Sequence, residues 1–432
     1  MEVFRERRRR LLDLIDGVAI FHAPAASLRN CDVEHPFRQS SDLYYLTGFE
    51  EPESVLVVTS VHPEHRAVMF VRPRDQEREP WEGPRPTPDA VKEQLGLDAA
   101  FGLDDLGAKL GDYLAGAGRL HYELGLDRAF DERVIAAVRR LRGRRHRSSR
   151  PWPCCIVHPE ATLHELRLVK GEAEIASLRR AAAIAAAAHL AAMRHAAPGR
   201  HEYEVEAALR EVFLRRGAAR VAFEPIVASG PNATLLHYTG NRRRIEAGDL
   251  VLVDAGGELD FYASDVTRTF PASGRFSGPQ RRIYEVVLEA ELAAIAVVRP
   301  GATVDQVHDS ALGTMVRGLV RLGLLQGDPA ELIAQESHKR YCPHRTSHWL
   351  GMDVHDAGSY FEGGQSRALV PSMALTVEPG IYVSPADDLA PAEYRGIGVR
   401  IEDDVLVTAS GHENLTQAIP KGVAEIEQAC RR

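Results

Sequence analysis

The first third of the chain alternates short apolar runs with longer segments of helical periodicity. The runs at 17–21, 54–59 and 67–71 are rich in β-branched residues and end at glycine, proline or polar residues, so each predicts a buried strand. The segment 3–16 predicts a helix before the first strand. Four prolines between residues 80 and 88 predict an irregular loop. This alternation is typical of an α/β domain.

The pattern changes near residue 166, where a long alanine-rich segment begins a second region. Charged residues at the start and proline or glycine at the end of apolar periodic segments predict helices at 172–195, 202–216, 277–299 and 304–322. Apolar runs predict strands at 250–255, 266–270, 374–377 and 399–408. We therefore predict an N-terminal α/β domain over residues 1–165 and an α+β domain over residues 166–432.

The composition is that of an ordinary globular protein. A length of 432 residues suits two or three domains, and 44% hydrophobic with 26% charged residues excludes collagen-like, disordered and membrane classes. The formal net charge of −8 argues against a general nucleic-acid binder, because neutralising phosphates needs a dominant basic surface. We interpret the seven arginines between residues 139 and 150 as a solvated connector.

Cysteine usage and apolar length both favour a cytoplasmic protein. Five cysteines without a CxxC pair predict neither a disulfide framework nor a zinc site. Acidic residues interrupt the apolar stretch at 11–16, so it does not resemble a signal-peptide core. The most apolar segment, 181–193, is shorter than the ~20 residues that span a bilayer. We expect no membrane partner.

Acidic and imidazole groups stand at the ends of apolar runs in the second region. Asp254 ends one predicted strand and Asp265 begins the next, and a turn through two glycines between them predicts a hairpin with both carboxylates near one end. Glu378 and Glu402 follow apolar residues in the same way, and His348 lies in a histidine-rich stretch. Each alone has an ordinary explanation, such as a turn cap or a satisfied core histidine. Together they form an oxygen-rich ligand set.

Such a set predicts a pair of divalent cations. Buried carboxylates are costly unless they are paired or bound to a cation, and four negative charges match two divalent ions. Oxygen ligands with one imidazole suit Mn²⁺ best, with Co²⁺ or Zn²⁺ also acceptable. Carboxylates that bridge two ions ~3.5–4 Å apart can hold a reactive water between them.

Ordered motifs over nearly the whole chain resemble the bacterial Xaa-Pro aminopeptidases (aminopeptidase P), which share the pita-bread metallopeptidase clan with prolidase and methionine aminopeptidase. The motifs lie at 41–52, 236–238, 249–256, 347–356, 376–382, 394–404 and 413–416. The resemblance implies an α/β N-terminal domain of the creatinase and aminopeptidase P type, followed by an α+β pita-bread catalytic domain. It also implies a homodimer or homotetramer.

The resemblance assigns a role to each predicted metal ligand. Asp254 would bind one ion, and His348 with Glu378 would bind the other. Asp265 and Glu402 would bridge both ions. Glu378 would also act as general base toward the bridging hydroxide, and would pass the proton to the leaving proline nitrogen.

The same resemblance implies further residues around the substrate. His237 and His355 would hydrogen-bond the peptide at the scissile bond, and Arg400, two residues before Glu402, would lie near the metal pair on the same face of the strand. Tyr360 matches an active-site tyrosine. His344 would donate a hydrogen bond to a carboxylate from just outside the ligand set.

Three positions depart from the family pattern or fit it loosely. Trp81 either reaches the cleft of a neighbouring subunit, as the resemblance implies, or is a loop tryptophan of its own domain. Arg345 and Ser372 stand where the family usually has glycine, a residue that often marks a positive φ or a close approach. None of the three is a predicted metal ligand.

The predicted reaction is release of the N-terminal residue from peptides with proline in the second position. A prolidase, which cuts only dipeptides, is the nearest alternative, although the 347–351 motif and Trp81 favour the aminopeptidase. A pita-bread binding protein without metals, or a creatinase-like amidinohydrolase, is a further alternative that the complete ligand set disfavours.

Overall fold

The computed structural model describes residues 2–143, 146 and 149–431 of the chain. The chain divides into two compact units, Met1–Leu166 (unit 1) and Arg167–Arg432 (unit 2). The predicted basic connector at 139–150 lies partly outside the described residues, and its first part belongs to the helix α6 (Arg128–Gly143).

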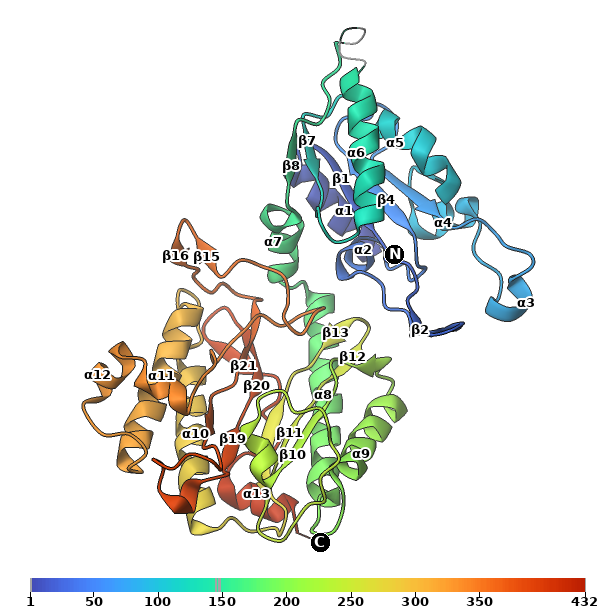
Figure 1. Cartoon of the computed structure of the whole chain (residues 1–432). Helices are drawn as coiled ribbons and strands as arrows, with labels where there is room; N and C mark the ends of the chain where they lie inside the picture. Colours follow the sequence, from blue (N-terminus) through green and yellow to red (C-terminus); the bar gives the residue numbers. More distant parts are fainter. Residues whose placement is uncertain (1, 144–145, 147–148, 432) are drawn as a thin grey trace. The chain divides into compact units, whose positions relative to one another are not determined.

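Unit 1 is built on a six-stranded sheet in the order β6-β5-β4-β1-β7-β8 (Figure 1). Its strands are β1 (Gly17–His22), β2 (Leu28–Asn30), β3 (Val33–Glu34), β4 (Val55–Thr59), β5 (Ala67–Val71), β6 (Ala99–Gly102), β7 (Arg119–His121) and β8 (Cys155–Val157), of which β2 and β3 form a separate hairpin. Its helices are α1 (Glu2–Leu14), α2 (Ser41–Thr47), α3 (Glu79–Glu82), α4 (Pro88–Leu95), α5 (Leu106–Leu114) and α6, and α7 (Leu163–Leu168) contains the division between the units. The three strands predicted from apolar runs are confirmed as β1, β4 and β5.

The predicted loop over residues 80–88 is wrong in part. Residues 79–82 form the short helix α3, and α4 begins at Pro88. Proline is tolerated in the first turn of a helix because its missing N–H would have no partner there. Thr87 caps α4 by accepting a hydrogen bond from the backbone of Ala90 at 3.3 Å. Proline density therefore marked helix starts as well as a loop.

Unit 2 places strands between two groups of helices, with α8 and α9 on one side and α10 and α11 on the other (Figure 1). The helices are α8 (Glu172–His195), α9 (Glu202–Arg215), α10 (Gly278–Val297), α11 (Val304–Arg321), α12 (Pro329–Ala334) and α13 (Val423–Ala429). The strands are β9 (Arg220–Val221), β10 (Ile226–Ser229), β11 (Leu250–Asp254), β12 (Gly257–Leu259), β13 (Tyr262–Ala263), β14 (Thr267–Pro271), β15 (Phe361–Glu362), β16 (Gln365–Ser366), β17 (Ala374–Val377), β18 (Gly380–Tyr382), β19 (Gly398–Arg400), β20 (Asp403–Val407) and β21 (His412–Asn414). The four predicted helices are confirmed.

Two predicted features of these strands need correction. β11 and β14 pair antiparallel as expected, with Asp254 opposite Thr267, but the β12–β13 hairpin is inserted between them instead of a simple turn. A Cβ on Gly256 would lie 1.6 Å from the backbone oxygen of Ser264, so only glycine allows this close crossing. The predicted strand 399–408 is two strands, because β19 pairs with β18 whereas β20 pairs with β17.

The core of unit 2 explains its most apolar helix. Among the described residues, α8 is the one helix long and apolar enough to cross a membrane by length and composition. Half of its most apolar window is buried inside the protein, and it packs against α9, β12 and β13.

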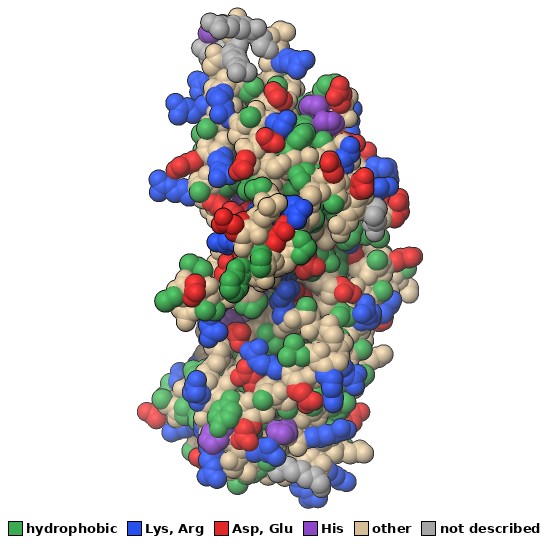
Figure 2. All heavy atoms as spheres, turned by 90° about the vertical axis from the view of Figure 1, so that its right-hand side faces the viewer, with side chains coloured by type: hydrophobic (Ala, Val, Ile, Leu, Met, Phe, Trp, Pro, Cys, Tyr) green, Lys and Arg blue, Asp and Glu red, His purple; other side chains and the backbone are tan. Residues whose placement is uncertain are grey.

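On the face shown in Figure 2, basic and acidic side chains are intermixed.

Candidate metal centre

Strand ends and strand breaks of unit 2 carry the predicted metal ligands. Asp254 is the last residue of β11, and Asp265 comes just before β14. Glu378 stands in the break between β17 and β18, and Glu402 in the break between β19 and β20. His348 lies beside β17, where its backbone oxygen accepts a hydrogen bond from the N–H of Thr376 at 2.9 Å. Each carboxylate is therefore placed where a strand stops or changes its partner, and the imidazole lies beside β17.

Three of these side chains form one compact group. Asp265, His348 and Glu402 each offer a ligand atom, and these atoms all lie within 4.8 Å of one another. His348 Nε2 is 3.4 Å from Asp265 Oδ2 and 3.5 Å from Glu378 Oε1. The fold thus brings together side chains that are up to 137 positions apart in the sequence.

The imidazole of His348 is oriented by the backbone. Its Nδ1 lies 3.0 Å from the backbone oxygen of Trp349, and a carbonyl oxygen can only accept a hydrogen bond. Nδ1 therefore carries a proton, so Nε2, which faces the carboxylates, is the nitrogen that would give up its proton to bind a cation. This is the arrangement in which a histidine binds a metal through Nε2.

Asp254 and Glu402 are fixed through Arg400 and Thr267. Arg400 Nη2 donates to Asp254 Oδ2 at 2.6 Å, and Arg400 Nε donates to Thr267 Oγ1 at 3.0 Å. The hydroxyl of Thr267 in turn donates to Glu402 Oε2 at 2.7 Å. The second oxygen of Asp254 is buried without a hydrogen-bond partner. A buried carboxylate oxygen left free in this way is suited to a cation.

The acid–base balance of the site also fits bound cations. Burial raises the pKa of Asp254 to about 6, although Arg400 opposes the change. Burial likewise raises the pKa of Glu378 to about 7, and the pKa of Glu402 well above its ordinary value, with the other carboxylates adding to the effect on Glu402. Burial alone would lower the pKa of His348, but Asp265 and Glu378 raise it to about 9. The carboxylates are thus held close together at an electrostatic cost that divalent cations would remove.

Comparisons with known proteins agree with this geometry. The sequence model described as metallopeptidase family M24 matches residues 176–409, and the model described as the N-terminal domain of aminopeptidase P matches residues 4–121. The chain is 43% identical over 428 residues to an Escherichia coli protein named Xaa-Pro aminopeptidase, covering 98% of this chain and 96% of the other. The chain belongs to the aminopeptidase P group of metallopeptidase family M24. The predicted combination of an α/β domain and a pita-bread domain is therefore confirmed.

Solved structures of M24 peptidases match over the full length. The Pseudomonas aeruginosa aminopeptidase PepP gives a TM-score of 0.95 at 45% identity, covering 99% of this chain and 97% of the other. A zinc-substituted Escherichia coli aminopeptidase P in complex with product gives a TM-score of 0.94 at 42% identity, covering 99% and 98%. The protein is a metallopeptidase, and hence a hydrolase.

Three further histidines of this M24 peptidase lie around the ligands. The rings of His355 and His348 meet edge to face, with centroids 4.4 Å apart. His237 is exposed and close enough to help lower the pKa of His355, an effect due mainly to burial. His344 does not donate to a carboxylate as predicted: its Nδ1 donates to the backbone oxygen of Arg345 at 2.7 Å and lies 3.8 Å from Glu378 Oε2.

Tyr360 and Trp81 have different surroundings from each other. The hydroxyl of Tyr360 accepts a hydrogen bond from the backbone N–H of Trp349 at 2.9 Å, and the two rings stack with centroids 5.1 Å apart. Tyr360 thereby holds the segment that carries His348. Trp81 lies in unit 1 on α3 and is 88% exposed. It belongs to a short helix and not to the predicted loop.

The two positions where glycine was expected behave differently. Arg345 is absent from the residues with positive φ, and its guanidinium forms an ion pair with Asp305 at the start of α11. Its side chain is thus directed to the surface. Ser372 does adopt the left-handed conformation, with φ of 73°. The glycine-like backbone is therefore kept at Ser372 despite the side chain.

Sequence reasoning missed three residues that support the ligands. The hydroxyl of Tyr382 accepts a hydrogen bond from Arg400 Nη1 at 2.9 Å and donates one to His344 Nε2 at 2.9 Å. Asp404 accepts a hydrogen bond from the backbone N–H of Asp265 at 3.2 Å. The third supporting residue is Thr267, whose hydroxyl links Arg400 to Glu402. Tyr382 and Asp404 lie inside the motifs at 376–382 and 394–404, so polar residues next to predicted ligands were the available signal.

Proposed function

We propose that the chain is a dinuclear-metal aminopeptidase that releases the N-terminal residue from peptides with proline in the second position. The observation that carries the proposal is the convergence of four carboxylates at the strand ends of unit 2 with one imidazole beside β17. The relatives named Xaa-Pro aminopeptidase, which match over nearly the whole chain, support the choice of substrate.

The resemblance to aminopeptidase P suggests how the ligands would be divided between two ions. Asp254 would bind one ion and His348 with Glu378 the other, while Asp265 and Glu402 would bridge them. Mn²⁺ is the first candidate because carboxylate oxygens dominate the set, with Co²⁺ and Zn²⁺ next. When bound, such ions supply a water nucleophile at neutral pH and polarise the scissile carbonyl.

The protein's own residues then manage protons and position. Glu378 would accept the proton of the attacking water and hand it to the proline nitrogen, which has no hydrogen of its own and must be protonated to leave. His237 and His355 would hydrogen-bond the peptide at the scissile bond. Arg400 would keep Asp254 aimed into the site, and Tyr382 would link Arg400 to His344.

The direct test is hydrolysis of an Arg-Pro-Pro peptide by the purified chain loaded with Mn²⁺, Co²⁺ or Zn²⁺. We expect free arginine as the first product, and loss of turnover in the Glu378→Gln variant. A matched Glu393→Gln variant, on the surface of the same unit, should keep full activity. No free arginine with any of the three metals would refute the proposal.

Two alternatives are outcomes of the same experiment. A prolidase would cleave an Xaa-Pro dipeptide and leave the tripeptide intact. A metal-free binding protein or a creatinase-like enzyme would hold no metal by elemental analysis after incubation with Mn²⁺.

The cytoplasmic location and the dimeric or tetrameric state stay predictions. Light scattering coupled to size-exclusion chromatography tests the oligomeric state, and a Trp81→Ala variant tests whether this exposed tryptophan contributes to another subunit's activity.

A further inference from the structure

Arg268 is a fully buried arginine on β14, three residues after the predicted metal ligand Asp265. Its guanidinium donates five hydrogen bonds. Nη1 donates to the backbone oxygens of Glu402 at 2.6 Å and Thr267 at 3.0 Å. Nη2 donates to Asp403 Oδ1 at 2.6 Å and to the backbone oxygen of Ile419 at 3.2 Å, and Nε donates to the backbone oxygen of Pro420 at 3.0 Å. All N–H donors of one side chain are therefore used on three segments of the chain.

Asp403 balances this charge and is itself fully bonded. Besides Arg268, it accepts from Thr416 Oγ1 at 2.8 Å, Asn414 Nδ2 at 2.6 Å and Lys421 Nζ at 2.5 Å. Glu291 accepts a further hydrogen bond from Lys421 at 2.6 Å. In this buried charge network, Arg268 and Asp403 are held in one arrangement, because moving either side chain would leave a buried polar group without its partner.

The network meets the metal ligands through the backbone of Glu402. Arg268 holds the carbonyl of Glu402, while the N–H of Glu402 donates to the backbone oxygen of Thr267 at 3.1 Å. Both the backbone N–H and the backbone carbonyl of Glu402 are thus hydrogen-bonded to β14. The next residues extend the effect, since Asp403 enters the network and Asp404 accepts from the N–H of Asp265.

We propose that Arg268 is a positioning residue that sets the distance between Glu402 and Asp265, the two carboxylates that would bridge the cations. This inference rests on the proposed dinuclear function. None of the five hydrogen bonds of Arg268 goes to a side-chain atom of a predicted metal ligand. Arg268 acts by fixing the backbone of Glu402 against β14, the strand that follows Asp265. Partners outside the ligand set that orient metal ligands typically contribute about 10–100-fold to metal affinity.

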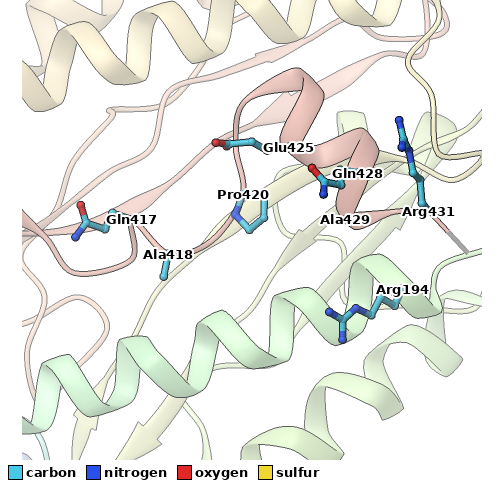
Figure 3. A pocket seen from close by; sticks show the side chains of 8 residues that line it. All are labelled: Arg194, Gln417, Ala418, Pro420, Glu425, Gln428, Ala429 and Arg431. Atoms are coloured by element: carbon cyan, nitrogen blue, oxygen red, sulfur yellow. The ribbon is translucent and has the colours of Figure 1, made fainter.

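A cavity next to the network supplies a control residue, Arg194, that lies nearby but forms no bond to Arg268 or Glu402. It has a volume of about 530 Å³ and lies between α8, the segment 417–420 and α13 (Figure 3). Pro420 lines the cavity and also accepts from Arg268, whereas Arg194 lines it from α8 and lies across from that segment. A change at Arg194 therefore alters the same cavity without removing a bond to Glu402.

The test is binding of Mn²⁺ alone to the full chain after removal of metals with a chelator. Isothermal titration calorimetry gives the number of ions and their affinities. Electron paramagnetic resonance shows whether two Mn²⁺ ions are exchange-coupled, as ions that share carboxylate bridges are. Arg268→Lys keeps the charge but offers three donors in place of five. The double variant R268Q/D403N removes both charges of the buried pair together, so neither is left without its counter-charge, and it guards against a variant that fails only by unfolding.

We expect two coupled ions in the wild type. Arg268→Lys and the double variant should each lose about 10–100-fold in affinity for the weaker ion, together with the coupled signal. Arg194→Gln should match the wild type. So should Glu291→Gln, which alters the same buried network without a bond to Glu402.

Two results overturn the inference in distinguishable ways. If the folded Arg268 variants bind two coupled ions as the wild type does, Arg268 is not a positioning residue and the proposed function stands. If the wild type binds no ion, the proposed function fails and the inference fails with it.

Discussion

Replacing Asp356 with asparagine is expected to destabilise unit 2 strongly. Asp356 Oδ2 accepts from Lys170 Nζ at 3.0 Å, and Oδ1 accepts from Arg167 Nη2 at 2.6 Å. These three side chains are between 1% and 4% exposed, so the variant would leave the positive charges of Lys170 and Arg167 buried beside a neutral amide. Removing one partner of a buried ion pair costs about 3–5 kcal/mol. At about 2 °C per kcal/mol for a unit of this size, the Tm should fall by about 6–10 °C.

Differential scanning calorimetry of the purified chain measures the effect, and a neighbouring residue provides the control. Asp353 accepts from the same Arg167 at 2.7 Å but is 39% exposed. Asp353→Asn should therefore cost no more than about 1 kcal/mol. The double variant K170M/D356N, which removes opposite charges together, should recover part of the loss. The reasoning is refuted if Asp356→Asn melts with Asp353→Asn, within 2 °C of the wild type.

The same carboxylate predicts a pH dependence. Burial alone would raise the pKa of Asp356, but Lys170 and Arg167 outweigh it and hold the pKa below its ordinary value. Because the folded pKa lies below the unfolded one, of about 3.9, the stabilisation is present at neutral pH. It is lost as the pH falls below about 4 and toward the folded pKa. The difference in unfolding free energy between the wild type and Asp356→Asn should therefore shrink with acidification, and a constant difference from pH 7 to 3 would contradict this.

Three other changes have defined outcomes. Ser372→Gly should leave the free energy of unfolding unchanged or raise it by up to about 1 kcal/mol, because glycine relieves the left-handed backbone but adds freedom to the unfolded chain. Ser372→Val should lower the free energy of unfolding. If urea unfolding shows the valine variant to be more stable than the glycine variant, the result is inconsistent with the φ of 73°. Tyr382→Phe leaves a buried N–H of Arg400 without its partner and should cost about 1–3 kcal/mol in the same assay, so a neutral result would show that this hydrogen bond is dispensable. Mn²⁺ at 100 times its Kd should stabilise the folded chain by about 2.7 kcal/mol, and a Tm that does not respond to Mn²⁺ would argue against a cation site.

The elements with regular apolar patterns were predictable, and the points where strands change partners were not. The run at 399–408 reads as one strand because β-branched and apolar residues stand on both sides of its acidic triplet. Nothing in its alternation encodes that β19 joins β18 while β20 joins β17. The same holds for the hairpin inserted after Asp254, whose signal was a glycine pair that also fits a simple turn.

The candidate ligands could be found from the sequence because a carboxylate at the end of an apolar run has few inexpensive explanations. The support around them could not. Tyr382 bonds a histidine 38 positions away, and Arg268 bonds a backbone oxygen 134 positions away. Such bonds depend on which strands become neighbours, and neither side chain stands out by its position in an apolar pattern. The helix at Pro80 was missed because proline both ends and begins helices.

The acidic triplet Glu402, Asp403 and Asp404 makes the length of this segment as important as its composition. Deleting one residue before Glu402 while β19 keeps its pairing would bring Asp403 to the position of Glu402, and Glu402 to that of Ile401, which is buried in the apolar core. Every residue type would still be present, yet the reactive group would be dismantled. Insertions should be accepted instead at Gly363 and Gly364, in the exposed turn between β15 and β16, where an added Cβ meets no atom within 4 Å. Evolution and engineering can therefore lengthen this enzyme at its turns far more easily than at the junction of β19 and β20.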